Sequence, residues 1–530
     1  MIQKIIFILK KNSFCDHYLL CKFYWRSWSL DVRDFSLRLL CVIKSLEKNR
    51  DLIILSMMIA QRILYDQCNT QYCYDDVDQY VFLLSSKSAM SPYGVLDLNP
   101  HSMQLEKDIS HHHMQDLNGQ WQIVEWLEVE HYGSWLTAYA LKYHISTIVV
   151  MSPSEPMMLE QIYIVQRTLL KHHIELLIRP NTQFMITQQE FTDQYKTPPV
   201  MEVFYRRMRK KFWLLMDGDQ PLWWKRNYDA ENRWFDKSFD TKPDQVRFAT
   251  TRQQALDLLQ DFVDTKLGRF GELEDAMYQH NDHVHHSLLS TSINFGLLTV
   301  WEVIDAVISS ECGINNKEWF IRQIVWRREY MYHRFWYYKD TIYTQNALDH
   351  TLSLPKRFWW PEDSPLKMHC VNHVLHTVKS TAYSHHITRL MIIGNFTLLM
   401  WYNPHHVNQW FWEMYADAFE RVVTPNVLGM SQFADGGNLA TKPYISSANY
   451  INKMSDYCWS CYYDPKMKSW PRACPMNYLY RNFVDTHRAL FKRQPYVVSN
   501  LQKVDLQQIR LEAQQFIDSI SPPHLDETIS

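Results

Sequence analysis

Residues 427–458 read VLGMSQFADGGNLATKPYISSANYINKMSDYC and form the most informative stretch of this 530-residue chain. They hold three of its twelve glycines, Gly429, Gly436 and Gly437. Small and polar residues around glycine let a ligand approach the backbone closely, so the first half of the stretch predicts a binding loop. The stretch ends on Cys458, the first of a closely spaced set of cysteines.

Downstream, Cys458 and Cys461 form a C-x2-C pair, and Cys474 follows directly before a proline. Thiolates at this spacing are typical of metal ligands, and a Cys-Pro pair closes the cysteine run of bacterial ferredoxins. A redox pair would leave Cys474 without a role. Spacing alone leaves an iron–sulfur cluster, zinc and redox cysteines open. The fourth ligand could be Cys312, Cys370 or an N-terminal cysteine.

Upstream, residues 369–396 read HCVNHVLHTVKSTAYSHHITRLMIIGNF, a pattern that predicts a helix. It carries the pair His385-His386, with Arg389 one turn further on. A histidine pair on a helix is more often part of the core or the surface than of an active site. An imidazole nevertheless titrates close to neutral pH and can serve as an acid or a base.

Composition sets the broad class of protein. Hydrophobic residues make up 46% and charged residues 21%, which indicates a globular chain of two or three domains. The net charge of −2 means that any contact with nucleic acid needs a local basic patch. One candidate is the run of basic residues within 206–211, which could equally be a solvated helix face. No GxGxxG or GxxxxGK[ST] motif occurs, which argues against the usual phosphate-binding loops.

From the sequence we expect neither a signal peptide nor a membrane span. The apolar run in MIQKIIFILKKNSF is too short for a signal peptide, and no apolar run reaches the length of a membrane span. We therefore expect a cytoplasmic protein without a membrane segment.

The chain divides into three predicted regions. Within residues 1–190, the strand-like runs YVFLL, STIVVMS and IELLIRP alternate with helical patterns, which predicts an α/β domain with a parallel sheet. Residues 191–250 are charged and rich in tryptophan and read as an interdomain linker. Helical periodicity dominates residues 251–520. The three histidines at 111–113 are expected in a surface loop.

These motifs resemble the iron–sulfur bacterial cryptochromes and photolyases, the photolyase-related branch that includes prokaryotic (6-4) photolyases. The similarity covers most of residues 200–490 and includes FGELEDAM (270–277), HSLLSTSINFGLLTVWEV (286–303) and NYDAENR (227–233). It implies the photolyase/cryptochrome fold, with a Rossmann-like α/β antenna domain followed by an all-α FAD-binding domain.

The resemblance implies a light-driven DNA repair enzyme, a lyase of (6-4) type. Excited reduced FAD would pass an electron to a pyrimidine dimer flipped out of damaged DNA. The implied catalytic residues are His386, as general acid, and its neighbour His385. The implied FAD-binding residues are Ser287, Leu288, Leu289, Ser290, Asn294, Arg389, Asn395, Asn426, Gly429, Met430, Tyr444 and Tyr450.

Other implied sites serve electron transfer and the lesion. Trp410 matches an electron-transfer tryptophan of the family, with Trp360 as the outer relay and Trp359 competing for that role. Asp229 and Arg233 resemble the residues that meet the DNA lesion, Asp229 through a divalent cation such as Mg²⁺. The protein is expected to act as a monomer.

Two further cofactors follow from the resemblance. A [4Fe-4S] cluster would be bound by Cys370, Cys458, Cys461 and Cys474, and its implied task is structural. The family also carries a 6,7-dimethyl-8-ribityllumazine antenna beside a Gly-Asp-Gln-Leu turn. Here that turn reads YDQC, with Tyr65 for glycine and Cys68 for leucine, and Ser85-Ser86 replaces an expected acidic residue. These departures argue against the antenna.

Two other functions remain open from the sequence. A cryptochrome would use the same fold and cofactors as a blue-light photoreceptor without repair. A non-photochemical iron–sulfur protein that binds nucleic acid, similar to a primase module, would need the cysteines but no flavin. The histidine pair and Asp229 favour repair over light sensing.

Overall fold

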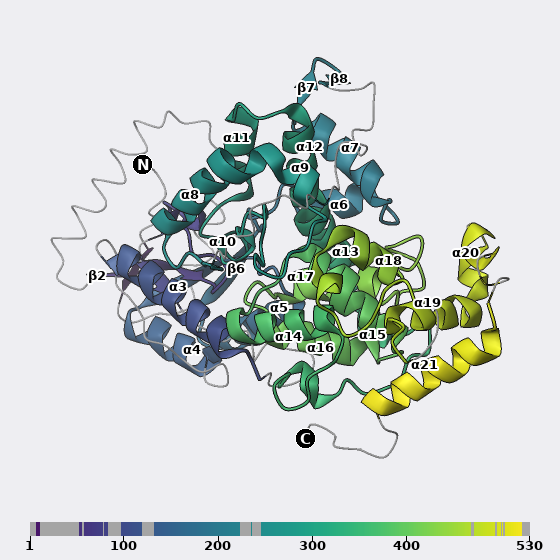
Figure 1. Ribbon diagram of the computed structural model, residues 1–530. Coiled ribbons are helices and arrows are strands. Elements are labelled where there is room, and N and C mark those ends of the chain that lie inside the picture. The colour runs from purple at the N-terminus through teal and green to yellow at the C-terminus, as the bar shows by residue number, and fades with distance from the viewer. Residues whose placement is uncertain are drawn as a thin grey trace.

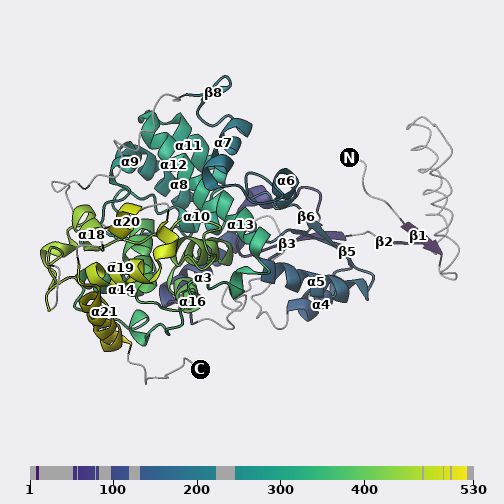
Figure 2. The same cartoon turned by 90° about the vertical axis from the view of Figure 1, so that its right-hand side faces the viewer.

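The computed structural model (Figures 1 and 2) describes residues 7–10, 52–55, 58–77, 79–82, 97–118, 132–222, 235, 245–467, 471–492, 495–499, 501 and 504–521. Near the N-terminus, β1 (Phe7–Lys10) and β2 (Leu52–Leu55) pair antiparallel. The remaining elements form a parallel sheet and a large helical region, which lie side by side in both views.

The sheet has four parallel strands in the order β4-β3-β5-β6. They are β3 (Met58–Ile63), β4 (Gln79–Phe82), β5 (Ile145–Met151) and β6 (Glu175–Arg179). The four residues Ile148–Met151 at the end of β5 are buried in succession, because neighbouring positions point to opposite faces and both faces are covered. The parallel sheet that the alternating pattern predicted is therefore confirmed.

Three helices accompany the strands: α3 (Pro100–Asn118), α4 (Tyr132–Lys142) and α5 (Pro156–Leu170). In Figure 2, α4 and α5 lie together on one side of the sheet. The histidines at 111–113 lie within α3, so the prediction of a surface loop is wrong. Residues Leu105, Ile109 and His113 follow one another at four-residue spacing on one helix face and are all buried. Helical periodicity continues through the histidine run.

The rest of the described chain is helical apart from the hairpin of β7 (Met216–Asp217) and β8 (Gln220–Pro221). The helices are α6 (Gln188–Gln194), α7 (Met201–Lys211), α8 (Arg252–Asp261), α9 (Phe270–Leu273), α10 (Ser290–Asn294), α11 (Val300–Ser309), α12 (Ile314–Gln323), α13 (Met331–Tyr338), α14 (His369–Thr381), α15 (Asn395–Leu399), α16 (Pro404–Met414), α17 (Glu420–Thr424), α18 (Ala448–Met454), α19 (Pro475–Thr486), α20 (Pro495–Ser499) and α21 (Leu506–Ile520).

The predicted fold class, a parallel-sheet domain followed by a helical domain, is thus confirmed. The domain boundaries stay a prediction, and the range 191–250 contains the helix α7 as well as residues outside the described part of the chain. Among the helices that the structure describes, none is both long and apolar enough to cross a membrane.

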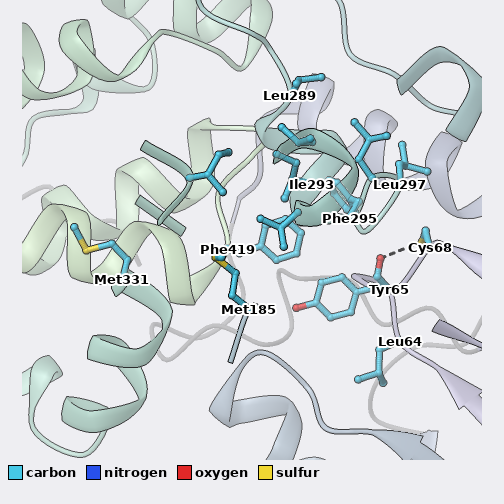
Figure 3. Close-up of a cluster of buried hydrophobic side chains, with 14 of the residues drawn as sticks. Leu64, Tyr65, Cys68, Met185, Leu289, Ile293, Phe295, Leu297, Met331 and Phe419 are labelled. Carbon is cyan, nitrogen blue, oxygen red and sulfur yellow. Dashed lines mark hydrogen bonds between the residues drawn. The ribbon is translucent and has the colours of Figure 1, made fainter. Parts of the chain in front are cut away.

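The carboxyl edge of the sheet packs against the helical region through a shared hydrophobic cluster (Figure 3). Tyr65, just after β3, stacks on Phe419 with ring centroids 5.8 Å apart and an interplanar angle of 4°. Phe295 also meets Phe419, edge-on, with ring centroids 5.0 Å apart. Cys68 turns its thiol toward the carbonyl oxygen of Tyr65, at 3.3 Å. Aromatic stacking at this edge joins segments more than 200 residues apart in the chain.

Buried charges reinforce the same contact. The guanidinium of Arg421, on α17, lies 3.5 Å from Asp66 and 3.7 Å from Glu155. Glu155 also accepts hydrogen bonds from the Tyr65 hydroxyl and from the backbone N–H of Glu420. Open α/β sheets commonly bind ligands at this edge. Here the edge is covered by side chains of the helical region.

Candidate functional site

A large cavity opens within the helical region. Its walls come from four stretches of chain, residues 270–294, 320–328, 383–390 and 411–431. The empty space between them, counted to the open mouth, is about 1350 Å³. The enclosed part of the cavity, without the open space at its mouth, measures about 260 Å³. Pockets for organic ligands usually measure roughly 300–1,000 Å³, so the enclosed part lies just below that range and a larger ligand would extend into the mouth.

Nine of the predicted catalytic and FAD-binding residues line this cavity. They are Ser287, Leu288, Leu289, Ser290, Asn294, His385, His386, Arg389 and Asn426. They come from segments that lie up to 139 residues apart in the chain, as the 426 − 287 separation shows. The structure thus brings together the segments that the resemblance had placed in one site.

The histidine pair follows the end of α14. That helix stops at Ala382, which adopts a left-handed conformation with φ 53°, and the chain then turns so that His385 and His386 reach the cavity wall. The ring of His385 stacks on that of His286, with centroids 4.4 Å apart. Among the residues that the structure describes, the Nδ1 atom of His385 and the Nε2 atom of His386 are buried without a hydrogen-bond partner. Buried polar atoms usually have partners, so these two nitrogens point to a ligand.

Burial and nearby positive charges favour the neutral form of the imidazole rings of His286, His385 and His386. Burial lowers the pKa of His386 well below its usual range, and Arg327 and Arg389 lower it further. Burial, followed by the charge of His286, does the same to the pKa of His385. The pKa of His286 falls to about 3, chiefly through burial. A ligand that brings negative charge would reverse this effect and favour the imidazolium forms.

Arg389 is held in the cavity wall by a two-pronged ion pair. Its guanidinium donates to both carboxylate oxygens of Asp417, at 2.9 and 3.0 Å, and its Nε donates to the carbonyl oxygen of Ser384 at 2.7 Å. Asn294 steadies the same segment by donating to the backbone carbonyl of Asp417 at 2.9 Å. Burial would lower the pKa of Arg389, but the Asp417 carboxylate raises it. Arg389 is therefore a permanent cation beside the histidines.

The rim at 287–290 contains a strained residue. Leu288 adopts a left-handed conformation with φ 58°, which a branched side chain rarely takes. The Ser287 hydroxyl accepts from the backbone N–H of Leu289 at 3.4 Å. Strain at a cavity rim is a common feature of ligand sites.

Several wall residues were not among those predicted from the sequence. They include His286, Arg327, Tyr383, Ser384 and Asp417. His286 is the first residue of the matched segment 286–303, so its position in that motif could have identified it. No sequence signal marked Asp417, because its ion-pair partner Arg389 lies 28 residues earlier in a different element.

Five predicted FAD-binding residues lie outside the lining of this cavity. Asn395 ties α15 to the loop before α18, since it exchanges hydrogen bonds of 3.0 Å with the backbone of Ser446. Gly429 gives room to Leu439, because a Cβ atom at Gly429 would approach the Leu439 side chain to 2.8 Å. Tyr450 donates to Asp275 at 3.4 Å.

The other two are Met430 and Tyr444. The sulfur of Met430 accepts from the guanidinium of Arg327, itself a wall residue, at 2.9 Å. Tyr444 packs against the large hydrophobic cluster. None of the five residues therefore lines the empty space of the cavity.

Trp410 lies one layer behind the cavity. It is fully buried on α16, and its ring meets that of the wall residue Phe411 at 5.0 Å. Its indole N–H donates to the carbonyl oxygen of Phe358 at 2.8 Å. Trp359 and Trp360 follow directly in the chain, Trp359 buried and Trp360 at the surface. The tryptophans therefore extend from the cavity wall outward.

The four predicted cluster cysteines surround a second, smaller hollow. Cys370 comes from the first turn of α14, Cys458 and Cys461 follow α18, and Cys474 precedes α19. None of these thiols forms a disulfide. Burial raises the pKa of Cys370, and the charges of the other three cysteines raise it further. No group of three or more His, Cys, Asp or Glu side chains within the described ranges is already arranged around a single metal ion.

Other predicted contacts have different outcomes. Asp229 and Arg233 lie outside the described residues, so the expected lesion contacts and the Mg²⁺ ligand stay predictions. Most of the basic run on α7 is engaged within the protein. Arg206 pairs with Glu202, Lys211 with Glu190 and Lys210 with Asp219.

The turn expected beside a lumazine antenna is filled by protein. Tyr65 and Cys68, which replace the glycine and leucine of the family, are fully buried in the hydrophobic cluster of Figure 3. The hydroxyl of Tyr65 bonds to Glu155, where a glycine would leave space. Because this space is filled by protein side chains, the residues of the turn do not fit an antenna chromophore.

Two solved structures share this architecture. A bacterial class III photolyase from Agrobacterium tumefaciens matches with a TM-score of 0.55 and 14% sequence identity, over 84% of this chain and 98% of that chain. A cryptochrome from Synechocystis matches with a TM-score of 0.55 and 11% identity, over 75% and 88% of the two chains. The fold is therefore that of the photolyase and cryptochrome class.

Sequence comparison narrows this class. Residues 111–278 match the family model described as deoxyribodipyrimidine photo-lyase-related protein. A protein from Agrobacterium fabrum named (6-4) photolyase is 40% identical, over 61% of this chain and 71% of the relative. The chain belongs to the photolyase-related family.

Proposed function

We propose that this protein is a light-driven DNA repair enzyme that binds FAD in the large cavity and acts on (6-4) photoproducts. The observation that carries the proposal is the pair His385-His386, whose buried ring nitrogens Nδ1 and Nε2 lack partners among the described residues at the wall of that cavity. The 40% identity to a protein named (6-4) photolyase supports the same choice of lesion.

The cavity residues suit a flavin dinucleotide. Ser287, Ser290 and Asn426 offer hydroxyl and amide groups, and the Oδ1 atom of Asn426 is buried without a partner among the described residues. Arg389 supplies a fixed cation for the diphosphate. When bound, reduced FAD would supply the light-excited electron for the reaction. Hydroxyls and a guanidinium can hold a diphosphate where the sequence lacks a glycine-rich loop.

His386 would then control the proton. In the cavity described here it is neutral, because of burial and because Arg327 and Arg389 oppose a further positive charge. The phosphates of the cofactor and of DNA would offset those cations and raise the pKa of His386. His386 would then hold a proton on Nε2 and donate it to the lesion. His385, stacked on His286, would fix the position of the pair.

The test of this proposal is a light-dependent repair assay with DNA carrying a defined (6-4) lesion. Replacing His386→Ala should lower repair by at least ~100-fold, the lower range for loss of a general acid, and leave the flavin content unchanged. The matched control is His111→Ala, at an exposed position on α3, which should repair as the unchanged protein does. Repair that persists in the His386 variant would refute the role of this residue.

A photoreceptor of the cryptochrome type is the second candidate function. It is favoured by the likeness in fold to the Synechocystis cryptochrome. The same assay separates the two, because a photoreceptor would reduce its flavin under blue light and leave both (6-4) and cyclobutane lesions in place. A chain without flavin absorption would exclude both functions and leave an iron–sulfur protein that binds nucleic acid.

We also propose a [4Fe-4S] cluster at Cys370, Cys458, Cys461 and Cys474. Its support is that four free thiols from three segments line one hollow, away from the cavity wall. A cluster there would join α14 to the loops beside α18 and α19 and so close an 88-residue loop, 458 − 370, which lowers the entropy of the unfolded chain.

Metal analysis tests the cluster. The purified protein should contain about four iron and four sulfide per chain, and their removal should unfold the helical region. Cys458→Ser should prevent accumulation of folded protein, whereas the control Cys312→Ser, a cysteine outside the hollow, should not. Stoichiometric zinc without sulfide would overturn the assignment.

A further inference from the structure

Two neighbouring tryptophans behind the cavity differ sharply in environment. The side chain of Trp359 is 6% exposed, and that of Trp360 is 37% exposed. Both follow Phe358, whose carbonyl oxygen accepts the indole N–H of Trp410. Their positions in the sequence do not show whether Trp359 or Trp360 exchanges electrons with Trp410.

Trp359 bonds to a buried carboxylate. Its indole N–H donates to the Oε2 atom of Glu413 at 2.6 Å, and Glu413 is 4% exposed. The other oxygen of Glu413 accepts from the side chain of Gln409 at 2.9 Å, and the backbone N–H of Asp97 also donates to this carboxylate. Burial raises the pKa of Glu413, and the three donors that converge on the carboxylate oppose this shift. A carboxylate with a raised pKa is a stronger proton acceptor. The Asp97 carboxylate is the other acidic group nearby.

Trp360 has the opposite electrostatic environment. The ammonium group of Lys379 lies 5.8 Å from the centre of its ring. A cation at this distance attracts the electron-rich ring of the ground state. It would repel the positive charge left when an electron is removed, whereas a carboxylate on Trp359 would attract that charge.

Trp359 is also well connected to the cavity. Glu413 and Trp410 lie one turn apart on α16. The indole N–H of Trp410 bonds to the peptide group that joins Phe358 to Trp359, at 2.8 Å. Toward the cavity, Trp410 meets Phe411 at 5.0 Å and Tyr415 at 5.7 Å, and Phe411 lines the wall. A continuous path of rings and one hydrogen bond therefore links the wall to Trp359.

We propose that Trp359, not Trp360, is the second tryptophan of the electron route, and that Glu413 is the base that takes its proton. This inference rests on the proposed flavin. With flavin bound, light would draw one electron from Trp410 toward the cavity, and Trp359 would then pass an electron to Trp410. Trp359 then loses its indole N–H proton to Oε2 of Glu413, which leaves a neutral radical and a carboxylic acid. A soluble thiol returns the electron, and the proton goes back to the indole nitrogen.

Flash spectroscopy of the flavin-loaded protein tests this assignment. Trp359→Phe should remove the long-lived tryptophan radical and slow photoreduction of the flavin, while the adjacent control Trp360→Phe should keep both. Glu413→Gln retains an acceptor for the indole N–H and cannot take the proton. In that variant the radical should remain a cation and photoreduction should fall roughly tenfold, since a charge-assisted hydrogen bond becomes a neutral one.

The outcomes separate this inference from the function proposed above. Normal photoreduction in Trp359→Phe, or an unchanged neutral radical in Glu413→Gln, would overturn it. Repair with chemically reduced flavin should be equal in all these variants, because the route is then bypassed. If the unchanged protein forms the Trp359 radical and repairs no lesion, the repair function fails and the electron route stands. A protein that binds no flavin would overturn both.

Discussion

The carboxyl edge of the sheet and the cavity of the helical region both contain a buried arginine paired with carboxylates. At the sheet edge, the guanidinium of Arg421 pairs with two buried carboxylates, Asp66 and Glu155, and the carboxyl group of Glu420 lies close enough to Glu155 to feel its charge. In the cavity, Arg389 pairs with Asp417 alone and leaves an open space beside it.

This difference separates a structural contact from a binding site. We call the cluster of Asp66, Glu155, Glu420 and Arg421 at the sheet edge the joint, because it connects the sheet to the helical region. At the edge, side chains from the sheet and from α17 fill the space where α/β proteins usually bind ligands, and the excess negative charge is enclosed within protein. In the cavity, Arg389 is paired with Asp417 while Arg327 adds a further positive charge, and buried atoms of the histidines and of Asn426 lack hydrogen-bond partners among the described residues. The sheet edge thus holds two regions together, and the cavity is free to take a cofactor.

The largest effect should come from removing the cation of the joint. Arg421→Met leaves Asp66 and Glu155 buried without their counter-charge, and should lower the free energy of unfolding by about 3–5 kcal/mol. Urea unfolding measured with a signal from the sheet region would show this loss.

The matched control for that experiment is another arginine pair on the surface. Arg206 pairs with Glu202 within α7 and is exposed, so Arg206→Met should cost less than about 1 kcal/mol. If both substitutions have equally small effects, the Arg421 cluster does not join the two regions, and the comparison with the cavity loses its basis.

The sequence predicted the elements well and their contacts poorly. The strands β5 and β6 and the helix α5 were predictable, because their hydrophobic periodicity is local. The histidines at 111–113 were misjudged, since a polar run was read as a loop although its spacing continues the buried face of α3.

The site was predictable to the extent that its residues lie in continuous motifs. The segment at 287–294 and the pair His385-His386 were found in this way, and both line the cavity. Residues that act through a distant partner gave no such signal. Glu155 accepts from the backbone N–H of Glu420 across 265 residues, and no local pattern marks either residue. Asn395 and Tyr450 lie in matched motifs and turn out to support the walls, because a motif does not distinguish a ligand contact from its scaffold.

A smaller and pH-dependent effect is expected from the crowded carboxylates of the joint. Burial, together with the charge of Glu155, raises the pKa of Glu420 from 4.5 to about 8. A carboxyl group whose pKa is raised on folding stabilises the protein fully below its unfolded pKa, and this contribution is lost as the pH rises through the folded pKa. Between pH 4.5 and about 8, the proton that Glu420 binds on folding should thus make the free energy of unfolding fall as the pH rises.

Glu420→Gln removes this dependence and keeps an acceptor for the hydroxyl of Tyr343, which donates to Glu420 at 2.5 Å. The variant should therefore gain stability relative to the unchanged protein as the pH is raised from 5 to 8, when unfolding is measured at both values. The cavity histidines have lowered pKa values and act in the opposite direction, but they are present in both proteins and cancel in the difference. Glu311→Gln, at an exposed position, should show the same difference at both pH values. If Glu420→Gln behaves like this control, Glu420 does not take up a proton on folding, and the sheet edge does not enclose the excess negative charge that distinguishes it from the cavity.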